Sequence, residues 1–333
     1  MPEQLFEIAR RTFDTPEFRG IECIEVEAKS VINRVPGGGL PFDWTINPYR
    51  GCSHACTYCF ARPTHTFLDM NAGRDFESKI VVKVNAPDVL RRQLAAPRWT
   101  GEHIAMGTGT DPYQRVEGRY RLMRGIIEAL TEKRNPFSIL TKGTLITRDI
   151  DLLQAAMERT DVSAAFSVGT LDERVWRETE PGTPHPKARI EAVSALTQAG
   201  IPAGVLMAPV LPGLSDAPDQ MRAVVEAALE AGATHVSPIM LHLRPGVREE
   251  FMPWLEQHHP DLVPRYRELY PRSYASPRER EHLRRRVAAL VHAGRRRWPA
   301  LDDGATGVVH RFSRRSRRAA TAEPEPATQP SLW

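Results

Sequence analysis

Three of the chain's four cysteines, Cys52, Cys56 and Cys59, lie in one short segment with the spacing C-x3-C-x2-C. Three thiolates can hold three irons of a cubane iron–sulfur cluster and leave the fourth iron open, whereas a ferredoxin normally supplies four cysteines from differently spaced runs. An open iron can bind a cofactor or a substrate. The spacing therefore indicates chemistry at a cluster rather than electron storage alone.

Other uses of three close cysteines are possible. A zinc site usually has four Cys or His ligands, and His54 or His65 could supply the fourth. A disulfide would leave an odd thiol, and a redox pair formed by Cys56 and Cys59 would leave Cys52 unexplained. The spacing favours an iron–sulfur cluster and leaves zinc as the alternative.

The residues around the cysteines carry a family resemblance. Tyr58 occupies the aromatic position of C-x3-C-x-aromatic-C, so the segment resembles the cluster loop of the radical S-adenosylmethionine (radical SAM) superfamily. The stretches 29–33, 45–49 and 107–114 resemble the branch that contains spore photoproduct lyase and DNA repair photolyase-like proteins. The resemblance spans about residues 25–245. It implies a [4Fe–4S] cluster on Cys52, Cys56 and Cys59, S-adenosylmethionine bound at the open iron, and a 5′-deoxyadenosyl radical.

The order of apolar runs predicts the fold. Helical patterns separate six runs that have the character of buried parallel strands, at 44–48, 103–107, 137–141, 163–168, 203–208 and 235–241. Six β/α units predict an α/β fold with a parallel barrel or partial barrel. The resemblance implies the (β/α)6 partial barrel of the radical SAM type. Residues 79–84 form an additional strand in this interpretation. We expect an N-terminal extension at 1–42, the core at 43–245, a helical extension at 246–312 and a disordered tail at 313–333.

In a β/α barrel the active site gathers at the carboxyl ends of the strands. The resemblance implies that residues at four such ends contact the cofactor: Tyr58 in the cluster loop, the segment Gly107, Thr108, Gly109, Thr110 and Asp111 after the second strand, Lys142 after the third, and Ser167 at the end of the fourth. In this assignment Asp111 accepts from the methionine ammonium, Lys142 pairs with its carboxylate, and Ser167 contacts a ribose hydroxyl. Each has a plainer alternative, such as a turn for the glycine-rich segment or a solvated surface position for the lysine.

Composition and charge restrict location and partners. No apolar run reaches the ~18 residues that a membrane span requires. The N-terminus does not resemble an export signal, and the few cysteines favour a reducing cytoplasm. Residues 244–318 hold 18 arginines against 9 acidic residues, a surplus that could bind nucleic acid or merely solvate a surface. The resemblance implies reduced flavodoxin or ferredoxin as the electron donor.

The substrate is not encoded in a recognisable motif. Spore photoproduct lyase uses a cysteine at the end of its second strand as a hydrogen donor, but this chain has no cysteine after Cys59. Thymine-dimer repair is therefore not assigned, although Tyr113 could replace the missing donor in principle. The sequence predicts a radical SAM enzyme with an unidentified substrate. A non-catalytic zinc- or cluster-binding module with a basic nucleic-acid-binding tail is the alternative.

Overall fold

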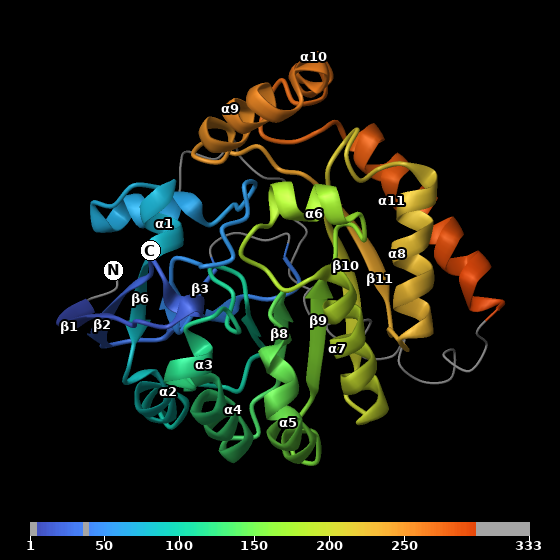
Figure 1. Ribbon diagram of the computed structural model, residues 1–333. Coiled ribbons are helices and arrows are strands. Elements are labelled where there is room, and N and C mark those ends of the chain that lie inside the picture. Colours follow the sequence, from blue (N-terminus) through green and yellow to red (C-terminus); the bar gives the residue numbers. More distant parts are fainter. Residues whose placement is uncertain (1–4, 36–39, 298–333) are drawn as a thin grey trace.

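A seven-stranded sheet forms the centre of the computed structural model, which describes residues 5–35 and 40–297 (Figure 1). Its order is β11-β10-β9-β8-β7-β4-β3, and every neighbouring pair except β3 with β4 is parallel. The predicted six-unit partial barrel is therefore confirmed. The strands are β3 (Ile32–Arg34), β4 (Trp44–Ile46), β7 (Ile104–Met106), β8 (Phe137–Thr141), β9 (Val162–Ser167), β10 (Ala203–Val210) and β11 (Val236–Met240).

The six parallel strands lie where the apolar runs predicted them, with bounds that differ by at most two residues at either end. β4 stops at Ile46, ahead of Asn47 and Pro48. A proline has no N–H to give to a sheet, so the chain leaves the sheet there. The cluster loop begins shortly afterwards.

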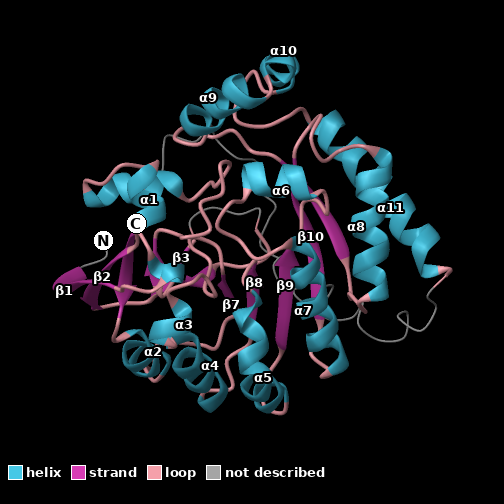
Figure 2. Cartoon of the chain, in the orientation of Figure 1, coloured by secondary structure: helices cyan, strands magenta, loops and turns pink. Residues whose placement is uncertain are grey.

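Helices pack on the outer side of this sheet and bury the stripes that the sequence predicted (Figure 2). Gly200 and Gly232 follow α7 and α8 with φ of +79° and +83°, the left-handed conformation that ends many helices. The helices up to this point are α1 (Arg74–Ser78), α2 (Ala86–Leu94), α3 (Glu117–Tyr120), α4 (Leu122–Glu132), α5 (Ile150–Met157), α6 (Glu173–Thr179), α7 (Pro186–Gln198) and α8 (Pro218–Glu230).

A second, four-stranded sheet was not predicted. It consists of β1 (Leu5–Thr12), β2 (Glu22–Ala28), β6 (Lys79–Lys83) and β5 (Tyr49–Arg50), in the order β1-β2-β6-β5. The additional strand expected at 79–84 is β6. Because β5 directly precedes the cluster loop, this sheet anchors the start of the loop. The division between an extension at 1–42 and a core at 43–245 stays a prediction.

Three helices follow the sheet: α9 (Arg248–His258), α10 (Val263–Leu269) and α11 (Pro277–Arg295). Ser276 caps α11 by accepting from the Glu279 N–H. Phe251, Leu255 and Tyr266 of α9 and α10 share an apolar cluster with Cys56 and Tyr58 of the cluster loop. The predicted tail at 313–333 lies outside the described residues. None of the helices that the structure describes has the length and apolar character needed to cross a bilayer.

Candidate cofactor-binding site

The cluster loop connects β5 to the short helix η2 (Arg62–Leu68), and its backbone is tightly fixed. Gly51 has a φ of +79°, and a Cβ there would lie 2.9 Å from the Phe76 carbonyl oxygen. The Cys52 N–H donates to that same oxygen at 2.9 Å. Glycine is therefore required where the loop crosses the 76–79 segment, and the crossing sets the position of the first cysteine.

The three cysteine side chains of this loop interact electrostatically with one another, and Cys52 and Cys56 are buried while Cys59 is half-buried. Burial raises the pKa of the Cys52 thiol, and the nearby Asp111, Cys59 and Cys56 raise it further. Burial also raises the pKa of Cys56 to about 12, although the positive charge of Lys142 opposes that shift. Without a bound cation the thiols are protonated, so the site is suited to a cationic metal centre that would ionise them.

Arg62, which the sequence analysis did not single out, holds the middle of the loop. It is 3% exposed, and its Nε and Nη2 donate to the Cys56 carbonyl oxygen at 3.0 and 2.9 Å. It also forms an ion pair with Glu77. An arginine three residues after the last cysteine was the only sequence signal for this role.

The Gly107–Asp111 segment lies against the cluster loop, as predicted. A Cβ on Gly107 would meet the Leu140 carbonyl oxygen at 1.8 Å, so only glycine fits between β7 and β8. The Thr110 hydroxyl donates to the Gly51 carbonyl oxygen at 2.6 Å. The Gly109 N–H donates to the Asn47 side chain at 3.0 Å. These bonds join the ends of β4 and β7 into one surface.

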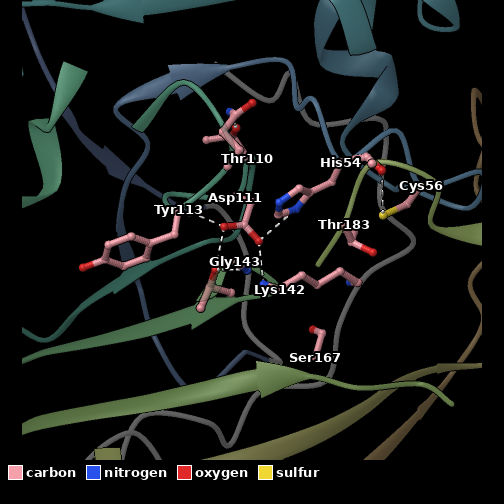
Figure 3. A network of polar contacts seen from close by, with 12 residues as sticks. His54, Cys56, Thr110, Asp111, Tyr113, Lys142, Gly143, Ser167 and Thr183 are labelled. Atoms are coloured by element: carbon pink, nitrogen blue, oxygen red, sulfur yellow. Dashed lines mark hydrogen bonds and ion pairs between the residues drawn. The ribbon is translucent and has the colours of Figure 1, made fainter. Parts of the chain in front are cut away.

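Asp111 is fully engaged by protein donors (Figure 3). Its Oδ1 accepts from the Thr141 hydroxyl at 2.6 Å and from the Tyr113 N–H at 2.9 Å. Its Oδ2 accepts from the Lys142 N–H at 2.6 Å and lies 3.3 Å from His54 Nδ1. Burial would raise the pKa of this carboxyl, but the charge of His54 and the hydrogen bonds from His54, the Lys142 N–H and the Thr141 hydroxyl lower it to about 2. The carboxylate connects the ends of β7 and β8 to the cluster loop.

Lys142 extends between Thr183 and Ser167 in Figure 3. Its Nζ lies 5.7 Å from the centre of the Tyr58 ring. Within the described residues the ammonium has no hydrogen-bond or ion-pair partner. Burial would lower the pKa of Lys142, but the neighbouring Cys56 and Glu180 side chains raise it, and the net shift is upward. A charged ammonium with no direct ion pair among the described residues therefore lies beside the cysteines, together with the buried Ser167 at the end of β9.

The weaker candidates occupy other positions. Tyr113 is buried, its hydroxyl donates to Asp149 Oδ2 at 3.1 Å, and its ring points away from Cys56 (Figure 3). Arg174 pairs with Glu178, which also contacts His259 at 2.8 Å. Cys23 is fully buried in β2, outside the cluster loop.

Cavity size does not locate the site. A cavity of about 840 Å³ lies beside His54, between the 12–18 segment and residues 182–184, and none of the three loop cysteines lines it. We place the candidate site at the thiols and Lys142, because they carry the chemistry.

Comparison with known families agrees with this geometry. The model described as the radical SAM superfamily matches residues 46–242, which include the cluster loop and nearly all of the six parallel strands. The chain belongs to the radical SAM superfamily.

Several relatives of this radical SAM protein are known by sequence. An uncharacterized protein of Mycobacterium tuberculosis is 50% identical over 283 residues, which cover 84% of this chain and 83% of the relative. A protein of Pseudomonas phage M6 described as "Radical SAM Nalpha-GlyT isomerase" is 28% identical over 194 residues, 57% of this chain and 37% of that protein.

Solved structures share the fold. Spore photoproduct lyase complexed with dinucleoside spore photoproduct has a TM-score of 0.59 at 15% identity, with 84% of this chain and 83% of the lyase covered. A variant of that lyase with bound AdoMet and dinucleoside spore photoproduct has a TM-score of 0.58 at 14% identity, covering 86% and 85%. The predicted branch of the superfamily is thus matched in architecture.

Proposed function

We propose that this protein reductively cleaves S-adenosylmethionine at a [4Fe–4S] cluster held by Cys52, Cys56 and Cys59. When bound, the cluster and S-adenosylmethionine together would supply a 5′-deoxyadenosyl radical, which acts on a substrate not yet identified. The observation that carries the proposal is the Lys142 ammonium, which has no direct ion pair among the described residues and lies close to the thiols of the cluster loop at the carboxyl ends of parallel strands. Superfamily membership supports an enzyme rather than a structural module.

The donor set fits a cluster better than a single zinc ion. Within residues 5–35 and 40–297, no three His, Cys, Asp or Glu side chains lie close enough to share one metal ion. The two histidines proposed as a fourth zinc ligand have other partners: His54 pairs with Asp111, and His65 Nε2 lies 3.0 Å from the Lys79 carbonyl oxygen. The proposal of a three-thiolate cluster with one open iron rests on the cysteine spacing and on superfamily membership.

The chain's own residues would bind and orient the cofactor. Lys142 would pair with the methionine carboxylate, because its half-buried ammonium has no direct ion pair within the described residues. Ser167 would contact the ribose, Tyr58 would provide an aromatic wall, and backbone groups of 107–110 would approach the methionine amino group closely, since glycines leave room there. In this proposal Asp111 acts through Lys142 and His54, because its own oxygens are already occupied.

The electron must come from outside the chain. We propose reduced flavodoxin or ferredoxin as the donor and the cytoplasm as the location. The four cysteines are all free thiols, as a reducing compartment would keep them.

Anaerobic reconstitution with iron and sulfide, followed by reduction and assay for 5′-deoxyadenosine, tests the proposal. Separate Cys52→Ala, Cys56→Ala and Cys59→Ala variants should lose the cluster absorbance near ~400 nm and product formation together, because each thiolate holds one iron. Cys23→Ala is the matched control and should keep both. A colourless protein that binds zinc, or loss of the cluster in Cys23→Ala, would refute the proposed site.

A further inference from the structure

A buried ion pair lies directly behind the cluster loop. Glu180 and Arg189 are 5% and 1% exposed, and Arg189 Nη2 lies 2.5 Å from Glu180 Oε2. Burial would raise the pKa of Glu180, but the charges of Arg189 and Lys142 outweigh it and lower that pKa. Taking two charges out of water is costly, and removing either partner leaves the other charge uncompensated. Glu180 and Arg189 therefore stay paired, and the groups that they contact are held in fixed positions.

The pair contacts two parts of the proposed site. The Tyr58 hydroxyl, in the cluster loop, donates to Glu180 Oε1. Arg189 Nη1 donates to the Ser167 carbonyl oxygen at 3.0 Å, at the end of β9. Glu180 and Arg189 thus connect the loop that carries the cysteines to the strand end that carries Ser167.

The backbone of residues 179–184, which we call the brace, supports the same connection. The Thr57 N–H donates to the Thr179 carbonyl oxygen at 3.0 Å, and the Gly182 N–H donates to the His54 carbonyl oxygen at 3.1 Å. A Cβ on Gly182 would lie 2.1 Å from the Ser53 carbonyl oxygen. The brace therefore follows the cluster loop closely from Ser53 to Tyr58. Arg189 fixes its far end by donating to the Pro184 carbonyl oxygen at 2.9 Å.

We propose that Glu180 and Arg189 are positioning residues, which hold Tyr58 and Ser167 at the spacing that S-adenosylmethionine requires. This inference rests on the proposed function. Neither residue is placed against the iron or the cofactor. Their loss should leave the three thiols able to hold iron, while the two walls of the cofactor site separate.

The test is cofactor affinity measured on an assembled cluster. Arg189→Met should keep about wild-type iron content but bind S-adenosylmethionine about tenfold more weakly or worse, the loss expected when a hydrogen bond to the cofactor is misplaced. Titration should be followed by the change that the cofactor causes in the EPR spectrum of the reduced cluster. Arg189→Lys keeps the charge but cannot reach all its partners, so it should recover part of the affinity. Tyr58→Phe keeps the ring and removes the hydrogen bond to Glu180. This variant provides the test if Arg189→Met does not fold.

Arg124→Met is the matched control. Arg124 pairs with the buried Asp149 at 3.0 Å, in a charged network that, within the described structure, contacts neither Tyr58 nor Ser167. The Arg124→Met variant should have a lower melting temperature than the wild type and the same cofactor affinity.

The outcomes separate the two proposals. A wild-type protein with no cofactor-dependent EPR change would refute the proposed function, and the inference with it. A wild-type protein that responds, while Arg189→Met or Tyr58→Phe binds the cofactor within about twofold of wild type, would refute only the positioning role. The pair would then stabilise the fold and nothing more.

Discussion

At the scale of single residues, Asp111 and Lys142 are linked by a hydrogen bond, whereas the sequence analysis gave each its own contact with the cofactor. Asp111 was expected to receive the methionine ammonium, and that expectation stays untested. Its two oxygens already contact four protein groups. One of these is the backbone N–H of Lys142, so the carboxylate fixes the start of the side chain that we propose for the cofactor carboxylate.

Replacing Lys142 with Ala should weaken S-adenosylmethionine binding by roughly 10–150-fold, because a charge-assisted contact contributes about 1.5–3 kcal/mol. Iron content should not change, since lysine is not an iron ligand. Titration on the reconstituted cluster measures both quantities. Lys133→Ala, at the exposed end of α4, is the control. Unchanged affinity in Lys142→Ala would remove this residue from the cofactor site.

Asp111→Asn should lower the free energy of unfolding of the apoprotein by roughly 2 kcal/mol at pH 7, since the carboxyl's pKa falls from 3.8 to about 2 on folding. A depressed pKa stabilises the fold above the unfolded value, and this stabilisation is lost as the pH falls. The difference between wild type and variant should therefore shrink between about pH 4 and pH 2. Denaturant unfolding across this range is the measurement, and Asp261→Asn, on an exposed turn, is the control. A difference that is independent of pH would contradict the account.

At the scale of elements, the brace allows a prediction about loop shape. Gly182→Ala would put a methyl group 2.1 Å from the Ser53 carbonyl oxygen, and backbone cannot move aside as a side chain can. We expect the cluster loop to be displaced and iron incorporation to fall severalfold. Gly118→Ala, whose Cβ would meet only Leu145 at 3.8 Å, should incorporate iron normally. Iron and sulfide analysis after reconstitution distinguishes the two, and normal iron in Gly182→Ala would show that the loop tolerates the shift.

The predictable elements are those whose signals are local. β8 has the same bounds as the predicted 137–141 run, because alternating apolar helices and strands are visible within short windows. The four-stranded sheet was missed because β2 pairs with β6 across more than fifty residues, and no short pattern records such a pairing. The same holds within the site. The cysteine spacing is local and was found, whereas Arg62 and the Glu180–Arg189 pair gain their roles only through contacts with distant backbone.

At the scale of the whole molecule, charge is unevenly distributed. Residues 244–318 carry a net charge of +9 and residues 1–243 a net charge of −3. Part of this surplus is compensated on α11, where Arg284 and Arg285 both contact Glu281. The remainder predicts salt-sensitive association with nucleic acid.

Affinity for duplex or single-stranded nucleic acid should fall steeply with salt, because each neutralised phosphate releases counterions. Deleting residues 313–333, which lie outside the described structure, should reduce the slope of log affinity against log salt by about 0.9 for each duplex phosphate that the tail no longer neutralises. The cluster should assemble as before. Fluorescence anisotropy over a salt series measures the slope, and an absence of binding at low salt would direct the substrate search to proteins and small molecules.

The antiparallel strand β3 occupies the outer edge of β4, and β11 ends the sheet on the other side. A full barrel closes when its first and last parallel strands pair with each other. Here β3 already pairs with the free edge of β4, which is the first parallel strand. The sheet therefore forms an open partial barrel rather than a closed barrel. Access to the cysteines therefore depends on segments outside the sheet, such as α9 and α10, whose Phe251, Leu255 and Tyr266 share an apolar cluster with Cys56 and Tyr58.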